Sequence, residues 1–241
     1  GKGGVGKTTF AGMAVRRLCE TGQTPVLALD ADPNTCLDAV LGVHVAHTVG
    51  GVREEAREIA KAGMGAGISK HELLDMKIQQ ALVEADGFDL VAMGRPEGRG
   101  CYCYANDVLR GVLGRLAEHY RHVVIDSEAG LENISRRTVQ QVDALVFVSD
   151  PSARGLATAR RLYDLSCEME VEVGAHVAIV NRAPDDSVLE RARAQFADTP
   201  VEVLGALPQD NDTAAHDALG RSVFELDRDN AVYRAASDLL G

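Results

Sequence analysis

Hydrophobic residues in this sequence fall into short apolar runs that alternate with longer stretches of helical spacing. Most of the runs are β-branched and continuously apolar, which indicates strands that are buried on both faces. Their alternation with helices predicts an α/β fold with a mostly parallel, twisted sheet and helices on both faces. The expected strands are 24–29, 89–93, 122–126, 144–149, 176–181 and 201–207. The expected helices are 7–20, 52–61, 70–85, 105–120, 131–139, 155–169, 187–197, 213–219 and 231–240.

Acidic or asparagine motifs close several of the expected strands. In open parallel sheets, ligands bind at the carboxyl ends of the strands, so these motifs predict one shared site. The chain shows neither an internal repeat nor a low-complexity linker. We therefore expect a single domain over residues 1–241.

A glycine-rich run of nine residues precedes the first expected helix, and its pattern predicts a phosphate-binding loop. The glycines let backbone N–H groups curl around phosphate oxygens, and the following helix N-terminus adds positive potential. Lys7 would reach the β- and γ-phosphates, and the Thr8 hydroxyl would bind Mg²⁺. A glycine-rich turn without a ligand is the structural alternative. The loop residues are Gly1, Lys2, Gly3, Gly4, Val5, Gly6, Lys7, Thr8 and Thr9.

The early lysine, Lys2, is not required by an ordinary phosphate loop. With it, the run resembles the deviant Walker-A ATPases, which include MinD, ParA and the nitrogenase iron protein. In that branch the extra lysine reaches across a dimer to the partner's nucleotide. The resemblance therefore implies a P-loop NTPase that closes as a nucleotide-sandwich homodimer, with Lys2 and Lys7 in catalytic roles.

Such a loop normally follows a buried strand directly, and in this sequence no residue precedes Gly1. We expect that strand to be missing because the sequence is a fragment or its start is mis-set. Its place would be in the middle of the sheet, so its neighbours would each lose a hydrogen-bonded ladder. A chain without it is expected to be poorly stable.

Two acidic segments follow expected strands after the loop. Carboxylates beside a Mg-nucleotide hold metal-bound water and orient the attacking water, whereas Asp before a helix also serves as a cap. The family resemblance implies that Asp32 orients or deprotonates water in the first switch and that Asp30 supports the Mg²⁺ shell. Asp126 ends its strand as the usual second Mg²⁺ anchor. Gly130 after it would let the second switch swing.

Two later segments resemble the family's base-binding loops. The resemblance implies that Asn181, followed by Arg182, hydrogen-bonds the adenine edge. It also implies that Pro208 lies against the base and that backbone groups up to Asp210 read it. Asn and Pro are common at strand ends for turn chemistry, which is the structural alternative.

A Cys-x-Cys pair, Cys101 and Cys103, lies in the glycine-rich stretch that follows the strand 89–93. Two thiolates at this spacing can chelate one soft or borderline metal ion but supply half of a tetrahedral Cys₄ site. A two-fold dimer would supply the other half, because an isologous interface places the same loop opposite itself. The alternative is two unligated loop thiols.

The segment Gly-Arg-Pro-Glu-Gly-Arg-Gly-Cys-Tyr-Cys resembles the CooC family, the nickel-insertion ATPases of carbon monoxide dehydrogenase maturation. This resemblance implies an ATP-hydrolysing metallochaperone that holds Ni²⁺ or Zn²⁺ on Cys101 and Cys103 across a dimer. Its client would be carbon monoxide dehydrogenase or a related enzyme. Four thiolates bind Zn²⁺ and Cu⁺ at least as readily as Ni²⁺, so the ligands do not select nickel.

Composition limits the alternatives. Formal net charge is −11, which disfavours nonspecific binding to DNA or to an anionic membrane. Five cysteines without an export signal indicate reduced thiols in a cytoplasm. A MinD- or ParA-like positioning ATPase would need a basic C-terminal helix or DNA face. The resemblance to the nitrogenase iron protein implies a second cluster cysteine after the second switch, and 131–135 contains none, although paired Cys-x-Cys loops could still hold a cluster.

Overall fold

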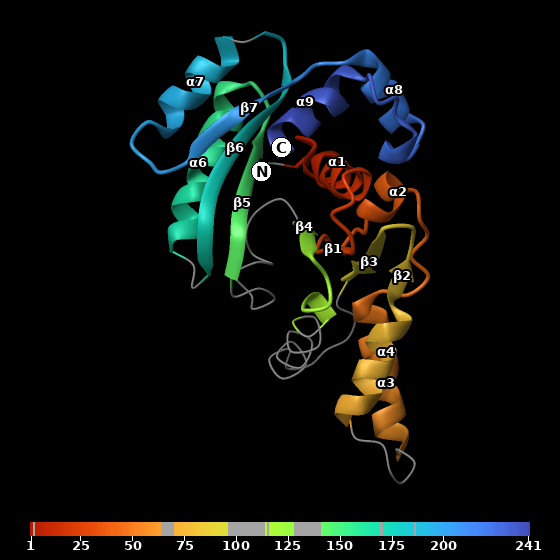
Figure 1. Ribbon diagram of the computed structural model, residues 1–241. Coiled ribbons are helices and arrows are strands. Elements are labelled where there is room, and N and C mark those ends of the chain that lie inside the picture. The colour runs from red at the N-terminus through yellow and green to blue at the C-terminus, as the bar shows by residue number, and fades with distance from the viewer. Residues whose placement is uncertain are drawn as a thin grey trace.

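The computed structural model describes residues 1, 3–63, 70–95, 114, 116–127, 141–168, 171–185 and 187–241. Helices and strands alternate along most of this chain, as the apolar pattern predicts (Figure 1). The strands are β1 Val26–Asp30, β2 Leu82–Glu84, β3 Phe88–Ala92, β4 His122–Asp126, β5 Gln141–Ser149, β6 Glu172–Ala183 and β7 Glu202–Pro208. The helices are α1 Lys7–Glu20, α2 Leu37–Leu41, α3 Val49–Gly63, α4 Lys70–Gln80, α6 Ala153–Cys167, α7 Ser187–Phe196, α8 Asn211–Ala218, the 3₁₀ turn η2 Val223–Glu225 and α9 Ala231–Leu240.

Parallel pairing dominates the strands. Within the described residues, one sheet has the order β2-β3-β1-β4 and the other the order β5-β6-β7. Only β2 runs antiparallel to its neighbour, β3. In the register of β1 and β4, Asp30 stands beside Asp126, so both carboxylates end their strands at the same edge of the sheet. This confirms the predicted fold class.

Helices cover both faces of the β5-β6-β7 sheet (Figure 1). Neighbouring residues of β5 point to opposite faces. Phe147 packs with residues of α6 and α7, whereas Val148 packs with α1 and α9 through Met13 and Tyr233. This double covering explains why residues 145–148 of β5 and 177–180 of β6 are continuously apolar.

The two sheets are separate between β4 and β5. Among the described residues, β4 pairs with β1 alone and β5 with β6 alone. Gly1 lies beside this gap, against the backbone carbonyl of Val148, where a Cβ on Gly1 would collide. The first residue of the expected phosphate loop thus lies at the boundary between the two sheets.

One expected helix is too long. The sequence predicts a helix over 70–85, but α4 ends at Gln80 and Leu82–Glu84 forms β2 instead. The apolar residues Ala81, Leu82 and Val83 continue a helical pattern, yet Leu82 pairs with Val91 of β3 and packs on the core beneath it. Tertiary pairing has overridden local spacing. The expected helix 131–139 and most of 105–120 lie outside the described residues.

Candidate functional site: a nucleotide-binding edge

The predicted phosphate loop leads directly into α1. Gly6 is the N-cap of this helix and has φ +92°, a left-handed conformation that favours glycine. The first turn itself contains no acidic residue, so the helix dipole there is not offset from within the helix. This geometry suits the binding of an anion such as a phosphate.

Asn181, near the end of β6, contacts the predicted phosphate loop and supports it. Its Nδ2 donates to the carbonyl of Val5 at 2.8 Å, and a Cβ on Gly6 would collide with the same amide. Arg182, at φ +58°, donates from Nη1 to the carbonyl of Gly4 at 3.2 Å. The structure thus places Asn181 and Arg182 against the phosphate loop. Their predicted contact with adenine stays a prediction.

Asp126 is the clearest sign of a metal site at this edge. Its side chain is 2% exposed, and Oδ2 has no hydrogen-bond partner among the described residues. Burial and, less strongly, the nearby charge of Asp30 raise the pKa of Asp126 to about 6, although a hydrogen bond with Thr8 and the charge of Lys7 oppose this rise. A buried carboxylate oxygen without a partner, beside a threonine hydroxyl, suits Mg²⁺. The residues therefore fit the cation that the sequence predicts.

Asp30 organises the first switch loop from within. Its Oδ1 accepts from the N–H of Asp32, and its Oδ2 accepts from the N–H groups of Cys36 and Leu37, each at 2.9 Å. Burial raises the pKa of this fully buried carboxyl, and these three bonds oppose the rise. Both oxygens therefore already shape the loop. The predicted support of Mg²⁺ by Asp30 stays a prediction.

Asp32 sits in the loop that Asp30 shapes, half-buried at the same edge. Its Oδ1 accepts from both the backbone N–H and the side-chain Nδ2 of Asn34, at 2.8 and 3.0 Å. Asn34 in turn accepts from Arg95. This contact was not predictable from sequence, because Asn34 and Arg95 belong to two different segments that lie 61 positions apart.

Pro208 and Asp210 lie at the end of β7, level with the end of β6. Pro208 pairs in register with Ala183. Asp210 is the N-cap of α8, and its Oδ2 accepts from the Thr213 N–H at 2.8 Å and from Asn230 Nδ2 at 3.0 Å. A hollow of about 610 Å³ lies here, lined by Pro184, Gln209, Asp210, Asn211 and Asp212. The side chain of Asp210 is occupied as a cap, and the predicted contact of Pro208 and Asp210 with the base stays a prediction.

Four predicted residues cannot be placed. Lys2, Cys101, Cys103 and Gly130 lie outside the described residues. In the part of the chain that the structure does describe, no three His, Cys, Asp or Glu side chains gather so as to hold a metal ion. No helix in that part is long and apolar enough to cross a membrane.

Comparison with known proteins agrees with this geometry. The family model described as "AAA domain" matches residues 1–177. An uncharacterized ATP-binding protein of Methanocaldococcus jannaschii is 39% identical over 99% of this chain and 94% of its own length. The carbon monoxide dehydrogenase accessory protein CooC of Rhodospirillum rubrum is 33% identical over 94% of this chain and 88% of its own.

The fold comparison points the same way. A ParA family ATPase from Chlorobium tepidum superimposes with a TM-score of 0.73 at 20% identity, over 99% of this chain and 93% of that one. At this identity the likeness shows the fold alone. Together with the family match and the phosphate loop described above, it assigns the chain: it belongs to the AAA domain family of ATP-binding proteins and has the α/β fold of the MinD and ParA ATPases.

Proposed function

We propose that this chain is an ATP-hydrolysing metallochaperone that works as a nucleotide-gated homodimer and inserts nickel into carbon monoxide dehydrogenase or a related enzyme. The observation that carries the ATPase part is the buried, unpartnered Oδ2 of Asp126 beside Thr8, at the mouth of the phosphate loop. The cargo part is supported by the Cys101 and Cys103 pair and by the 33% identity to CooC over most of both chains.

The ATPase chemistry follows from the described edge. Gly6 and the first turn of α1 bind the phosphates, and Lys7 adds positive charge where the γ-phosphate develops negative charge. Thr8 and Asp126 would hold Mg²⁺, which neutralises phosphate charge when bound. Asp32 holds or deprotonates the attacking water. Lys2 from the partner subunit would complete the site, so hydrolysis would depend on the dimer.

Metal handling would use the two-fold axis of that dimer. Cys101 and Cys103 from both copies supply four thiolates, which suits a tetrahedral site. Opening of the dimer after hydrolysis would separate the two halves and release the ion. Nucleotide state would then control metal affinity, as delivery to a client enzyme requires.

A cysteine exchange tests the proposal. The Cys101→Ser/Cys103→Ser double variant should lose tight binding of Ni²⁺ or Zn²⁺, whereas the wild type should bind about one ion per dimer. The matched control is Cys36→Ser/Cys167→Ser, which removes two exposed thiols elsewhere and should leave binding unchanged. Calorimetric titration measures both. Full metal binding by the first variant would contradict the proposal.

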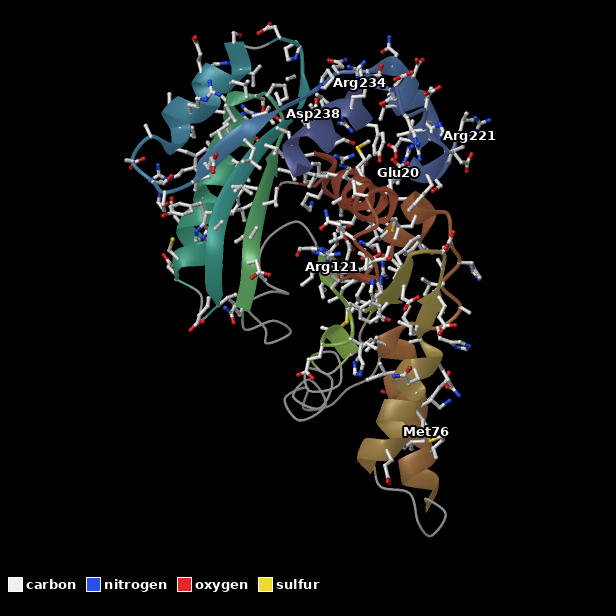
Figure 2. All side chains as sticks on the ribbon, in the orientation of Figure 1. Glu20, Met76, Arg121, Arg221, Arg234 and Asp238 are labelled. Atoms are coloured by element: carbon white, nitrogen blue, oxygen red, sulfur yellow. The ribbon has the colours of Figure 1, made fainter. Side chains whose placement is uncertain are left out.

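A positioning ATPase of the MinD or ParA kind is the alternative, because solved members of that group share the fold. The apolar side of α9 argues against membrane targeting through this helix. Val232, Tyr233 and Ala236 are buried in the core, while Arg234 and Asp238 lie exposed on the same helix (Figure 2). ATP-dependent pelleting with anionic liposomes or DNA would favour the alternative. An ATP-driven electron donor would instead be brown after anaerobic purification, because it would carry an iron–sulfur cluster.

A further inference from the structure

The last residues of β6 leave the regular ladder of the sheet. From Val180 to Ala183, β6 takes three steps where its partner β7 takes two, so one extra residue is inserted. Arg182 lies in this bulge at φ +58°, a left-handed conformation that residues other than glycine rarely adopt. Bulges re-aim side chains beside binding sites, and this one directs Asn181 and Arg182 towards the phosphate loop.

Hydrogen bonds connect this bulge to the phosphate loop. Asn181 Nδ2 donates to the Val5 carbonyl at 2.8 Å, and Arg182 Nη1 donates to the Gly4 carbonyl at 3.2 Å. Within the bulge, the backbone N–H of Arg182 donates to Asn181 Oδ1 at 2.9 Å. Because this bond holds the oxygen of the planar Asn181 amide, the amide nitrogen stays directed at the loop.

The two loop carbonyls determine where the N–H groups of the loop point. In a planar trans peptide, the C=O of one residue and the N–H of the next point in opposite directions. A bond from β6 to the Gly4 carbonyl therefore turns the Val5 N–H away from β6, and a bond to the Val5 carbonyl turns the Gly6 N–H away likewise. Gly4 and Gly6 have φ +74° and +92°, and successive N–H groups in such turns form an anion-binding concavity.

We propose that Asn181 and Arg182 are positioning residues of the phosphate loop, which fix two of its peptide planes so that the N–H groups of Val5 and Gly6 meet the phosphates of the nucleotide. This inference rests on the ATP-binding part of the proposed function and is independent of the metal cargo. Both residues then act on every ligand that carries a pyrophosphate group, whatever its base. A contact between Asn181 and adenine would act only on ligands that carry adenine.

Equilibrium titration with Mg-ADP and Mg-pyrophosphate tests the proposal, because the second ligand has no base. Asn181→Ala should weaken the binding of both ligands about tenfold, and Arg182→Gly should weaken both about threefold, since each change removes one hydrogen bond to the loop. Arg182→Lys keeps a donor and should recover part of the loss. Arg193→Ala removes an exposed arginine from the last turn of α7 and is the matched control, with unchanged binding of both ligands.

Thermal unfolding separates positioning from a general loss of structure. Arg182→Gly places glycine at a positive φ, so its melting temperature should equal or exceed that of the wild type. Binding of Mg-pyrophosphate should nevertheless become weaker in this variant. A residue that only supports the fold would lose stability and affinity together.

Loss of Mg-ADP affinity with unchanged Mg-pyrophosphate affinity in both Asn181→Ala and Arg182→Gly would overturn the proposal in favour of a base contact. A wild type that binds Mg-ADP but no Mg-pyrophosphate would also overturn it, because a loop oriented in advance must accept the phosphates alone. Failure of the proposed function looks different. A wild type that binds both ligands without hydrolysing ATP would contradict the ATPase, while the binding constants of the variants still decide the role of Asn181 and Arg182.

Discussion

Gly6 is constrained twice, once by its own backbone and once by a neighbour. Its φ of +92° favours glycine, and the amide of Asn181 occupies the place where a Cβ would stand. Gly4, at φ +74°, shares the first constraint but has open space around it. Comparing substitutions at these two glycines therefore separates the cost of backbone strain from the cost of steric collision.

Alanine substitutions at Gly4 and Gly6 test this difference directly. Gly4→Ala should lower the free energy of unfolding by about 1 to 2 kcal/mol, the cost of a left-handed alanine. Gly6→Ala should lower it further and also weaken Mg-ADP binding, because Asn181 must move away from the Val5 carbonyl. Urea unfolding and nucleotide titration measure the two effects. Equal losses in both variants would show that the Asn181 contact places no limit on the loop.

At this scale the sequence predicts residue types better than their partners. The phosphate loop, Asp30, Asp32 and Asp126 are recognisable because each motif needs specific groups at fixed spacing, and the structure brings them to one edge. The bond from Asn181 to the Val5 carbonyl is not predictable, because the two residues are far apart in sequence. The same holds for Arg95 and Asn34.

Among the helices, α1 is tied to the C-terminal part of the chain by a buried cation. The Arg16 side chain is 3% exposed, donates to the carbonyls of Val223 and Leu226 at 2.6 and 2.8 Å, and lies 3.8 Å from the centre of the Tyr233 ring. Glu20 completes the cluster by accepting from Arg16 at 3.0 Å and from Tyr233 at 2.8 Å, where α1 meets α9 (Figure 2). The apolar pattern alone would place Arg16 on the surface.

This cluster predicts a pH-dependent contribution to stability. Burial raises the pKa of Glu20, but hydrogen bonds from Tyr233 and Arg16 outweigh burial and lower the pKa below its usual 4.5. A lowered folded-state pKa stabilises the protein above the unfolded value, and this contribution is lost as pH falls through the folded value. Glu20→Gln should therefore lower the free energy of unfolding at pH 7 by about 1 to 2 kcal/mol.

The free energies of unfolding of the wild type and of Glu20→Gln should converge at low pH. Below pH 4.5 the difference between wild type and Glu20→Gln should shrink as the carboxylate protonates. Glu202→Gln, at an exposed position at the start of β7, controls for the loss of a glutamate. A constant difference from pH 7 to the acid limit of folding would show that the charge of Glu20 is not what stabilises the cluster.

At the scale of the whole molecule, the sequence predicts where the strands of the two sheets end but not the order in which they pair. Strand order cannot be read from apolar runs, but the end of each strand can, and both sheets present their carboxyl ends to one nucleotide-binding edge. β2 was missed because three apolar residues suit either helix or strand until a partner edge is known.

The helical hairpin of α3 and α4 extends away from both sheets (Figure 1). Lys77 pairs with Glu55 across it at 2.8 Å, and Met76 is 57% exposed on its outer part (Figure 2). Glu55 is exposed, so water screens the pair, and Lys77→Ala should change the free energy of unfolding only slightly. A larger loss in urea unfolding would mean that the hairpin depends on this pair.

The central claim is that two copies of the chain close over nucleotide and share one metal ion. Native mass spectrometry of the protein with a non-hydrolysable ATP analogue, Mg²⁺ and Ni²⁺ tests it in one measurement. The account predicts a dimer that carries two nucleotides and a single nickel ion. A nucleotide-loaded monomer without nickel under the same conditions would contradict it.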